Sequence, residues 1–121
     1  QLIAGSDVNN FNDSLNSFQQ LTPTGATQVT AAPIDAANVE IPAGAPAGGI
    51  ILPISYPGAS IEVLNNSGNT ATIYAQGNDQ IQNASNSYLA TGAGFAITTL
   101  LSWEFKCIKT GFWQKSSFAG T

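Results

Sequence analysis

From residue 26 onward, the sequence is a series of short strand-forming runs separated by glycine, proline and asparagine. These runs cover residues 28–34, 38–41, 49–53, 60–65, 70–75, 87–90, 94–101, 103–108 and 112–115. Many short strands with frequent turn signals are typical of a sandwich or barrel. No helical periodicity persists after Gly25. The sequence therefore predicts one all-β domain over residues 26–121, built as an antiparallel β-sandwich or jelly roll.

The most informative pair of runs lies at residues 60–75. Ile61 and Val63 share one face of the first run, and Glu62 shares the other face with Leu64. The Asn-Asn-Ser-Gly-Asn segment between the runs supplies residues that tolerate positive φ angles. We expect a β-hairpin here, followed by a turn that leads back into the sheet through Ile81.

The C-terminal runs show the same alternation. Trp103, Phe105 and Cys107 alternate with polar or charged residues as far as Lys106, and Thr110-Gly111 supplies a turn. This pattern predicts a closing hairpin whose aromatic side chains pack in the core. Cys107 is expected to be a buried, inert thiol, since the chain has no histidine to activate it.

Residues 1–25 form an N-terminal arm rich in asparagine, serine and glutamine. Phe11, Leu15, Phe18 and Leu21 recur at spacings of four, three and three, which favours a short helix with one apolar stripe. So short a helix is marginal in water unless it packs on something. Docking on a partner or neighbouring copy and packing on the protein's own core both remain open. Phe11, Leu15 and Phe18 are the candidate partner-binding residues.

Charge is scarce in this chain. Only 8% of the residues are charged, against about 25% in ordinary soluble domains. A neutral polar surface is cheap to desolvate, which suits contacts between subunits, although a low-charge monomer would also fit. The net charge is −4, there is no arginine, and all three lysines lie in the last sixteen residues. We therefore expect no nucleic-acid partner and no membrane partner.

The sequence offers little for catalysis or metal binding. It has no histidine and a single cysteine, which excludes His-based acid–base catalysis, the usual nucleophile pairs and thiolate clusters. The seven acidic residues are scattered, and Asp79 sits among amides in a segment better explained by Asx turns. We expect no enzymatic activity, no catalytic residues, no cofactor and no metal site.

A series of short motifs resembles small β modules encoded by tailed bacteriophages, the capsid decoration proteins of the cement or head-fibre type. The motifs are Gly25-Ala-Thr-Gln28, Gly49-Ile-Ile-Leu-Pro53, Gly58, Ile61-Glu-Val-Leu-Asn65, Ile73-Tyr74, Gly77-Asn-Asp-Gln-Ile81, Gly92, Phe105 and Gly111-Phe-Trp113. The resemblance covers residues 25–115. It implies sandwich or tulip-like subunits that form a homotrimer and bind the major capsid protein on the outer surface of the virion.

A second hypothesis is a phage tail or neck fibre module that binds a host glycan or receptor. Related modules also occur in tail and neck components, so the resemblance leaves the position in the particle open. The feature expected for this function is an exposed aromatic ring beside asparagine or glutamine. The candidates are Trp103, Trp113, Tyr56 and Tyr88.

Overall fold

A computed structural model describes residues 17–82, 87–98 and 101–117 of the chain, and it shows an all-β protein. The described residues form two β-sheets and no helix. In spatial order, sheet A contains β1 (Phe18–Gln20), β3 (Asn38–Ile41), β5 (Ser60–Asn65), β9 (Leu101–Lys109), β10 (Phe112–Ser117) and β7 (Gln80–Ile81). Sheet B contains β2 (Ala32–Pro33), β4 (Gly48–Ile51), β6 (Ala71–Tyr74) and β8 (Phe95–Ile97). The fold-class prediction is confirmed.

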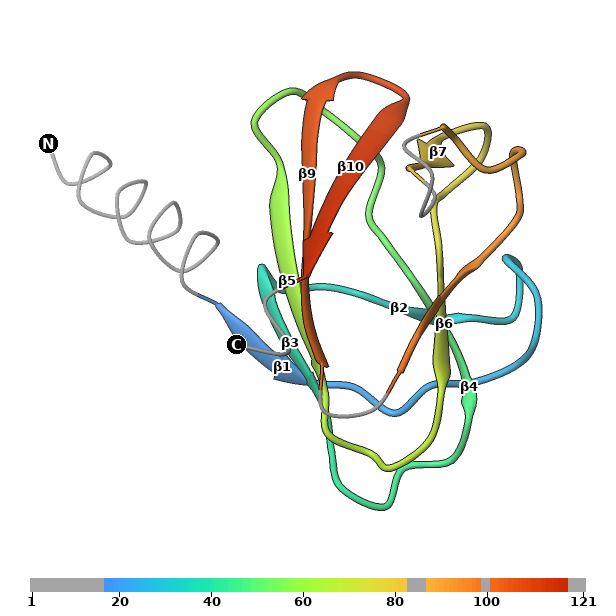
Figure 1. Cartoon of the computed structure of the whole chain (residues 1–121), viewed down its shortest axis with the longest axis vertical. Coiled ribbons are helices and arrows are strands. Elements are labelled where there is room, and N and C mark those ends of the chain that lie inside the picture. The colour runs from blue at the N-terminus through green and yellow to red at the C-terminus, as the bar shows by residue number, and fades with distance from the viewer. Residues whose placement is uncertain (1–16, 83–86, 99–100, 118–121) are drawn as a thin grey trace, which may run out of the picture.

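In Figure 1, β5 and β9 of sheet A lie to the left of β4 and β6 of sheet B. The core is a single cluster of aliphatic and aromatic side chains from both sheets. Its most deeply buried apolar members are Ile41, Ile50, Leu52, Val63, Ile73, Ile81, Ile97, Phe105 and Trp113. Cys107 is also buried, as predicted, and its thiol donates a hydrogen bond to the carbonyl of Lys109 at 3.2 Å.

The chain crosses from one sheet to the other at every connection from β1 to β9. Odd-numbered strands therefore collect in sheet A and even-numbered strands in sheet B, until β10 joins sheet A. As far as β6, successive visits to one sheet run in the same direction, so β1, β3 and β5 are parallel neighbours, as are β2, β4 and β6. β8 and β9 instead run antiparallel to β6 and β5. The sheets are consequently mixed, whereas the sequence predicted antiparallel ones.

The predicted C-terminal hairpin is confirmed. β9 and β10 are antiparallel, Gly111 adopts a positive φ of 95° at the turn, and the register shifts between Phe112 and Trp113. Trp113 and Phe105 are fully buried. β9 also pairs with β5 on its other edge, so this hairpin completes sheet A.

The predicted hairpin at residues 60–75 is wrong. β5 lies in sheet A and β6 in sheet B, so the Asn-rich segment between them is an arch that spans the two layers. The edges of β5 pair with β3 and β9, and those of β6 pair with β4 and β8. The local residue pattern describes each strand correctly but says nothing about which strand it pairs with.

The arch is organised by Asn65, whose side chain is fully buried. Its Nδ2 group donates to the carbonyls of Asn69 at 2.8 Å and Ile97 at 3.0 Å. Its Oδ1 atom accepts hydrogen bonds from the Ser67 backbone N–H at 3.1 Å and the Ser67 hydroxyl at 2.7 Å. Both donor positions and both acceptor positions of the amide are thus used inside the protein.

The structure also changes the view of the N-terminal arm. Phe11 and Leu15 lie outside the described residues. Phe18 lies in β1, which pairs in parallel with β3, and Leu21 packs against the core cluster. The predicted helical stripe therefore does not extend to Phe18 and Leu21, because this segment supplies the edge strand of sheet A.

Two other predicted strands are much shorter or absent. In the run at residues 28–34, only Ala32–Pro33 forms a strand. In the run at residues 87–90, only an isolated bridge between Gln82 and Tyr88 is present. Asp79, predicted to form a local Asx turn, instead accepts a hydrogen bond from the distant Ser55 backbone N–H at 3.0 Å.

Candidate functional site

The outer face of sheet B is covered by the chain's own residues 22–31, which we call the cover segment. The Tyr74 hydroxyl of β6 donates to the carbonyl of Ala26 at 2.9 Å. The Gln28 amide donates to the carbonyls of Ala75 at 2.6 Å and Gly77 at 3.0 Å. These contacts leave Tyr74 buried although its side chain is on the outer side of the sheet.

Small residues allow the cover segment to approach this closely. A Cβ atom added to Gly49 would lie 2.8 Å from the Tyr74 ring and 3.2 Å from the Ala31 Cβ atom. At Gly94, a Cβ atom would meet the Thr72 methyl group and lie 2.8 Å from the other side of the Tyr74 ring. The glycines therefore frame the tyrosine ring, and sheet B offers little free surface here.

The outer face of sheet A is not covered in this way among the described residues. In β5 the side chains alternate between exposed and buried along the whole strand, which is the pattern of a sheet with one solvated face. We call this surface the open face. Its outward side chains are Phe18, Gln20, Asn38, Glu40, Ser60, Glu62, Leu64, Ser102, Glu104, Lys106, Ile108 and Gln114.

Exposed apolar side chains lie on both sides of a groove in the open face. Phe18 of β1 is 64% exposed and Leu64 of β5 is 39% exposed. Between them, Asn38 and Glu40 of β3 form the floor of a groove of about 390 Å³. A groove flanked by apolar side chains is suited to receive a residue of a partner surface.

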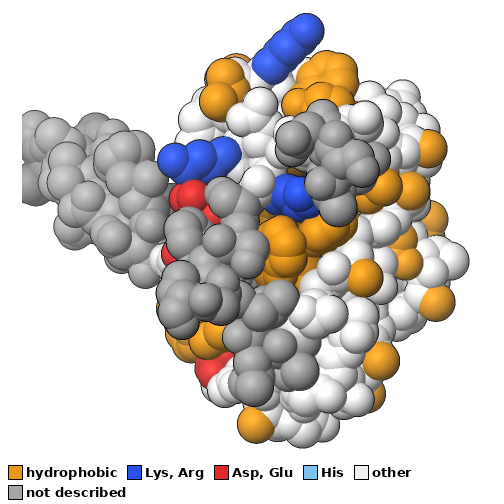
Figure 2. All heavy atoms as spheres, in the orientation of Figure 1, with side chains coloured by type: hydrophobic (Ala, Val, Ile, Leu, Met, Phe, Trp, Pro, Cys, Tyr) orange, Lys and Arg blue, Asp and Glu red, His pale blue; other side chains and the backbone are white. Residues whose placement is uncertain are grey.

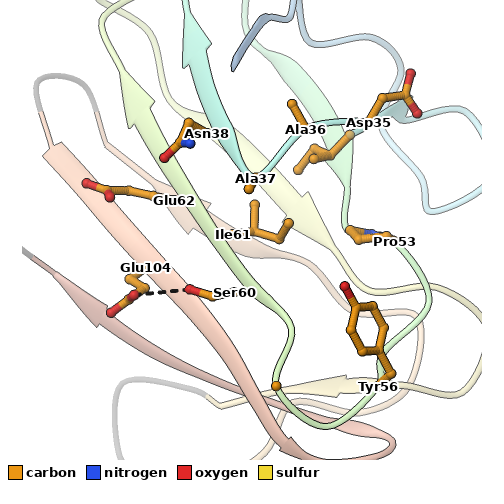
Figure 3. A pocket seen from close by; sticks show the side chains of 12 residues that line it. Asp35, Ala36, Ala37, Asn38, Pro53, Tyr56, Ser60, Ile61, Glu62 and Glu104 are labelled. Carbon is orange, nitrogen blue, oxygen red and sulfur yellow. Dashed lines mark hydrogen bonds between the residues drawn. The ribbon is translucent and has the colours of Figure 1, made fainter. Parts of the chain in front are cut away.

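A second hollow, of about 420 Å³, lies beside the first residues of β5 (Figure 3). Glu62 and Glu104 line one side, and Tyr56 lies on the other side on the loop that follows β4. Ile61 and Ala37 lie between these two sides. The hollow exists because β3 begins only at Asn38, so Ser60 and Ile61 have no β3 residue in register with them.

Charged side chains are concentrated in sheet A. Its strands contain Glu40, Glu62, Glu104, Lys106, Lys109 and Lys115, whereas the strands of sheet B contain no charged residue. In Figure 2 the red and blue side chains lie toward the left, top and centre of the view, while the right side is neutral. Among the described residues, the charged side chains outside the strands of sheet A are Asp35 and Asp79, which lie in loops.

Most of the aromatic candidates for glycan recognition serve as packing residues. Trp113 is fully buried, and Tyr88 packs edge-on against Phe112 at a ring distance of 5.0 Å. Trp103 packs against Phe95, and Lys115 Nζ lies 5.8 Å from the centre of its ring. Tyr56 differs from these, since it is 59% exposed and lines the hollow.

Among the predicted partner-binding residues, the structure describes Phe18 and places it on the open face. The sequence did not predict that Leu64, Glu62 and Glu104 also lie on the open face. The shared face of Glu62 and Leu64 was visible in the alternation of residues 60–65. The pairing of β5 with β9, which brings Glu104 beside them, is a long-range feature with no local signal.

The described residues contain no group of three or more His, Cys, Asp and Glu side chains placed to hold a metal ion. Within the same residues, no helix has the length and apolar character needed to cross a membrane.

The sequence matches no protein-family model, and no curated protein is significantly similar to it.

Proposed function

We propose that this chain is a non-enzymatic structural protein of a tailed bacteriophage that decorates or cements the outer surface of the capsid. The motifs at residues 25–115 that resemble decoration modules support this proposal, and the two-sheet β fold agrees with it. The observation that carries it is the open face of sheet A, a neutral-to-acidic surface with exposed Phe18 and Leu64 beside a groove.

In this proposal the protein acts by non-covalent attachment. The open face binds the major capsid protein, and burial of Phe18 and Leu64 supplies apolar contact area. The low charge content keeps the desolvation cost of the surrounding surface small. Copies related by the symmetry of the shell, assembled as homotrimers, would convert weak single contacts into durable attachment.

The first test measures binding to capsids of the phage that encodes the protein, prepared without it. The Phe18→Asp/Leu64→Asp variant should lose co-sedimentation with these capsids, because two carboxylates would have to be buried against the shell. Val29→Asp is the matched control, since Val29 is 91% exposed on the cover segment, away from the open face. Wild-type binding by the double variant, or equal loss in the control, would rule out the open face.

The N-terminal arm is tested separately by deletion. The deletion should remove residues 1–16 only, because β1 begins at Phe18 and belongs to sheet A. If Phe11 and Leu15 contribute to docking, this variant should bind capsids more weakly while sheet A stays folded. Imaging of particles with and without the protein should show its density on the shell, and density on the tail would overturn the capsid assignment.

Exposure of Tyr56 favours one alternative, a tail or neck fibre module that binds a host glycan. An exposed ring beside carboxylates and Asn38 is a combination suited to a sugar. In that case a glycan array should give a signal that Tyr56→Ala removes without loss of fold. An array without signal would exclude the glycans that it displays.

A further inference from the structure

Sheet A has an open strand edge on each side. In the part of the chain that the structure describes, no strand pairs with the outer edge of β1. On the other side, β7 pairs only with Phe112 and Trp113, so the outer edge of β10 from Gln114 to Ser117 has no partner strand. The Gln82 side chain reaches the Lys115 N–H there at 3.5 Å. Open edges carry N–H and C=O groups that can pair with another chain.

The two open edges lie at the same level of the sheet. One row of residues in register crosses five strands, and it consists of Phe18, Asn38, Glu62, Glu104 and Ser116. β1 runs in the same direction as β10, because β9 is antiparallel to both β5 and β10. Rotation of a copy about an axis along the strands, as in a closed ring, would therefore place its β1 parallel to β10, with its Phe18 beside Ser116.

The hydrogen-bonding groups of β1 that face its open edge belong to Phe18 and Gln20. The Ser17 carbonyl accepts a hydrogen bond from β3, and the Leu21 N–H donates one to β3. Backbone groups of successive residues in a strand point to opposite sides. The N–H and C=O groups of Phe18 and Gln20 therefore point away from β3.

The corresponding groups of β10 belong to Lys115 and Ser117. The carbonyls of Gly111 and Trp113 accept hydrogen bonds from the β7 side, so the groups of Lys115 and Ser117 point to that same side, beyond the end of β7. With Phe18 of another copy beside Ser116, its N–H meets the Lys115 carbonyl and its C=O meets the Ser117 N–H. The register required by a ring is thus one in which donors meet acceptors.

Opposite charges lie beside the two edges. Next to β1, Asp35 is exposed, its backbone N–H donates to Gln19 Oε1 at 2.9 Å, and its carboxylate points away from the other labelled side chains in Figure 3. Next to β10, Lys115 Nζ lies 5.3 Å from the centre of the Phe95 ring and 5.8 Å from that of Trp103. Within the described residues, neither Asp35 nor Lys115 takes part in an ion pair.

These charges meet only when the two different edges meet. Gln19 and Trp103 belong to one register row, so the two charges beside them lie at the same level of the sheet. A symmetric contact between two β1 edges would instead bring two copies of Asp35 together, and one between two β10 edges would bring two copies of Lys115 together. Like charges across an interface oppose association, so charge favours β1 of one copy against β10 of the next.

We propose that copies of this chain associate head to tail, with β1 of one copy pairing in parallel with β10 of the next. Asp35 then faces Lys115 of the adjacent copy, and sheet A continues from copy to copy. The proposal assigns the contact between copies, and it rests on the proposed function for the expectation that copies associate. The Phe18 side chain stays on the open face, so this contact leaves that face available to the capsid protein.

The test measures association of the full chain by sedimentation velocity without capsids. The wild type should form a discrete oligomer at about 0.1 mM or below. Asp35→Lys and Lys115→Glu should each weaken association at least about tenfold, because like charges would meet at every contact. Asp35→Lys/Lys115→Glu restores opposite charges and should associate nearly as the wild type does. A monomeric wild type, or a folded double variant no better than the single variants, would overturn the proposal.

Lys109→Glu is the matched control for Lys115→Glu. Lys109 Nζ also lies 5.3 Å from the centre of an aromatic ring, that of Phe112, but it is at the turn of the β9–β10 hairpin and away from the open edge. This variant should associate like the wild type. Equal loss of association in Lys109→Glu and Lys115→Glu would show a nonspecific charge effect and contradict the contact.

A backbone variant tests the strand pairing itself. Because the Ser117 N–H points away from β9, Ser117→Pro removes a donor from the open edge and leaves the hairpin ladder intact. It should weaken association, while Ser117→Ala, which keeps the N–H, should not. Association that is unchanged by the proline would overturn the proposed strand pairing.

The outcomes separate this proposal from the proposed function. The association assay contains no capsid, so capsid binding by a chain that stays monomeric would overturn only the contact between copies. Association with the expected response to the charge variants, but without capsid binding, would overturn the proposed function and leave the contact.

Discussion

The outer faces of the two sheets differ in both cover and charge. Tyr74 of sheet B points outward yet is buried beneath the cover segment, while Phe18 of sheet A points outward and is 64% exposed. The strands of sheet B contain no charged residue, and β3, β5 and β9 of sheet A contain glutamates. Outward apolar side chains thus serve internal packing on one face and remain available for a partner on the other.

The strand sequences reflect this difference. In β6, three of the four residues are buried, so the strand is packed on both sides. In β5, buried and exposed residues alternate without a break. Small residues such as Gly49 accompany the covered face, because the cover segment must lie close to the sheet. Continuous burial along a strand together with nearby glycine therefore distinguishes the covered outer face of sheet B from the open face of sheet A.

The largest effect is expected from removing the ring on which the cover segment rests. Tyr74→Ala should lower the free energy of unfolding by about 3–5 kcal/mol, because it removes a buried aromatic side chain and its hydrogen bond to Ala26. Phe18→Ala on the open face should change it by less than about 0.5 kcal/mol. Urea unfolding measures both. Similar values for the two variants would contradict the distinction between the faces.

The arch that separates the two sheets should be almost as sensitive. Asn65→Ala should cost about 2–3 kcal/mol, because it leaves the carbonyl of Ile97 and the Ser67 groups without their buried partner. The control is Asn66→Ala, since the Asn66 side chain makes a long bond of 3.4 Å to Glu40. Thermal unfolding should show a much smaller loss of stability for Asn66→Ala than for Asn65→Ala. Equal losses in the two variants would argue against a special role for Asn65.

A smaller effect is expected from filling the space beside the tyrosine. Gly49→Ala should cost about 1–3 kcal/mol, because its Cβ atom would lie 2.8 Å from the Tyr74 ring. It should also make the cover segment more accessible to limited proteolysis. Val29→Ala, on the exposed part of that segment, is the control for a change of sequence alone. If Gly49→Ala leaves both the stability and the rate of proteolytic cleavage unchanged, the cover segment can move enough to accommodate the added methyl group.

The smallest effect has the opposite sign and concerns the open face. Glu62→Gln should raise the free energy of unfolding by up to about 0.5 kcal/mol at low salt, because it removes a like-charge cross-strand pair with Glu104. The gain should shrink in 1 M salt, where the Debye length is about 3 Å. A double-mutant cycle with Glu104→Gln measures the coupling. No coupling at low salt would mean that the two charges are already compensated.

Local features of this protein were predictable and long-range pairing was not. The strands at residues 38–41 and 60–65 have the predicted bounds, because alternation and flanking turn residues define them. The arch was mistaken for a hairpin because the same Asn-rich segment fits either connection. β1 was predicted as helix, since the spacing of Phe11, Leu15 and Phe18 matches a helical period and its strand depends on pairing with distant β3.

The candidate site was predictable to a similar extent. Phe18 was proposed as a docking residue, and docking through it stays a prediction. The partnership of Glu62 with Glu104 depends on the register between strands about forty residues apart in sequence. The hollow depends on where β3 begins relative to β5, which no pattern within either strand records.

The winding of the chain between the sheets also bears on how the protein is made. β9 fills the position between β5 and β10 in sheet A, and it comes from residues 101–109. During synthesis β5 therefore emerges with one edge lacking its partner until β9 follows. Pairing over such sequence distances slows folding. Sheet A should consequently complete only after the hairpin of β9 and β10 has left the ribosome, so β5 waits for a partner that is made after β6, β7 and β8.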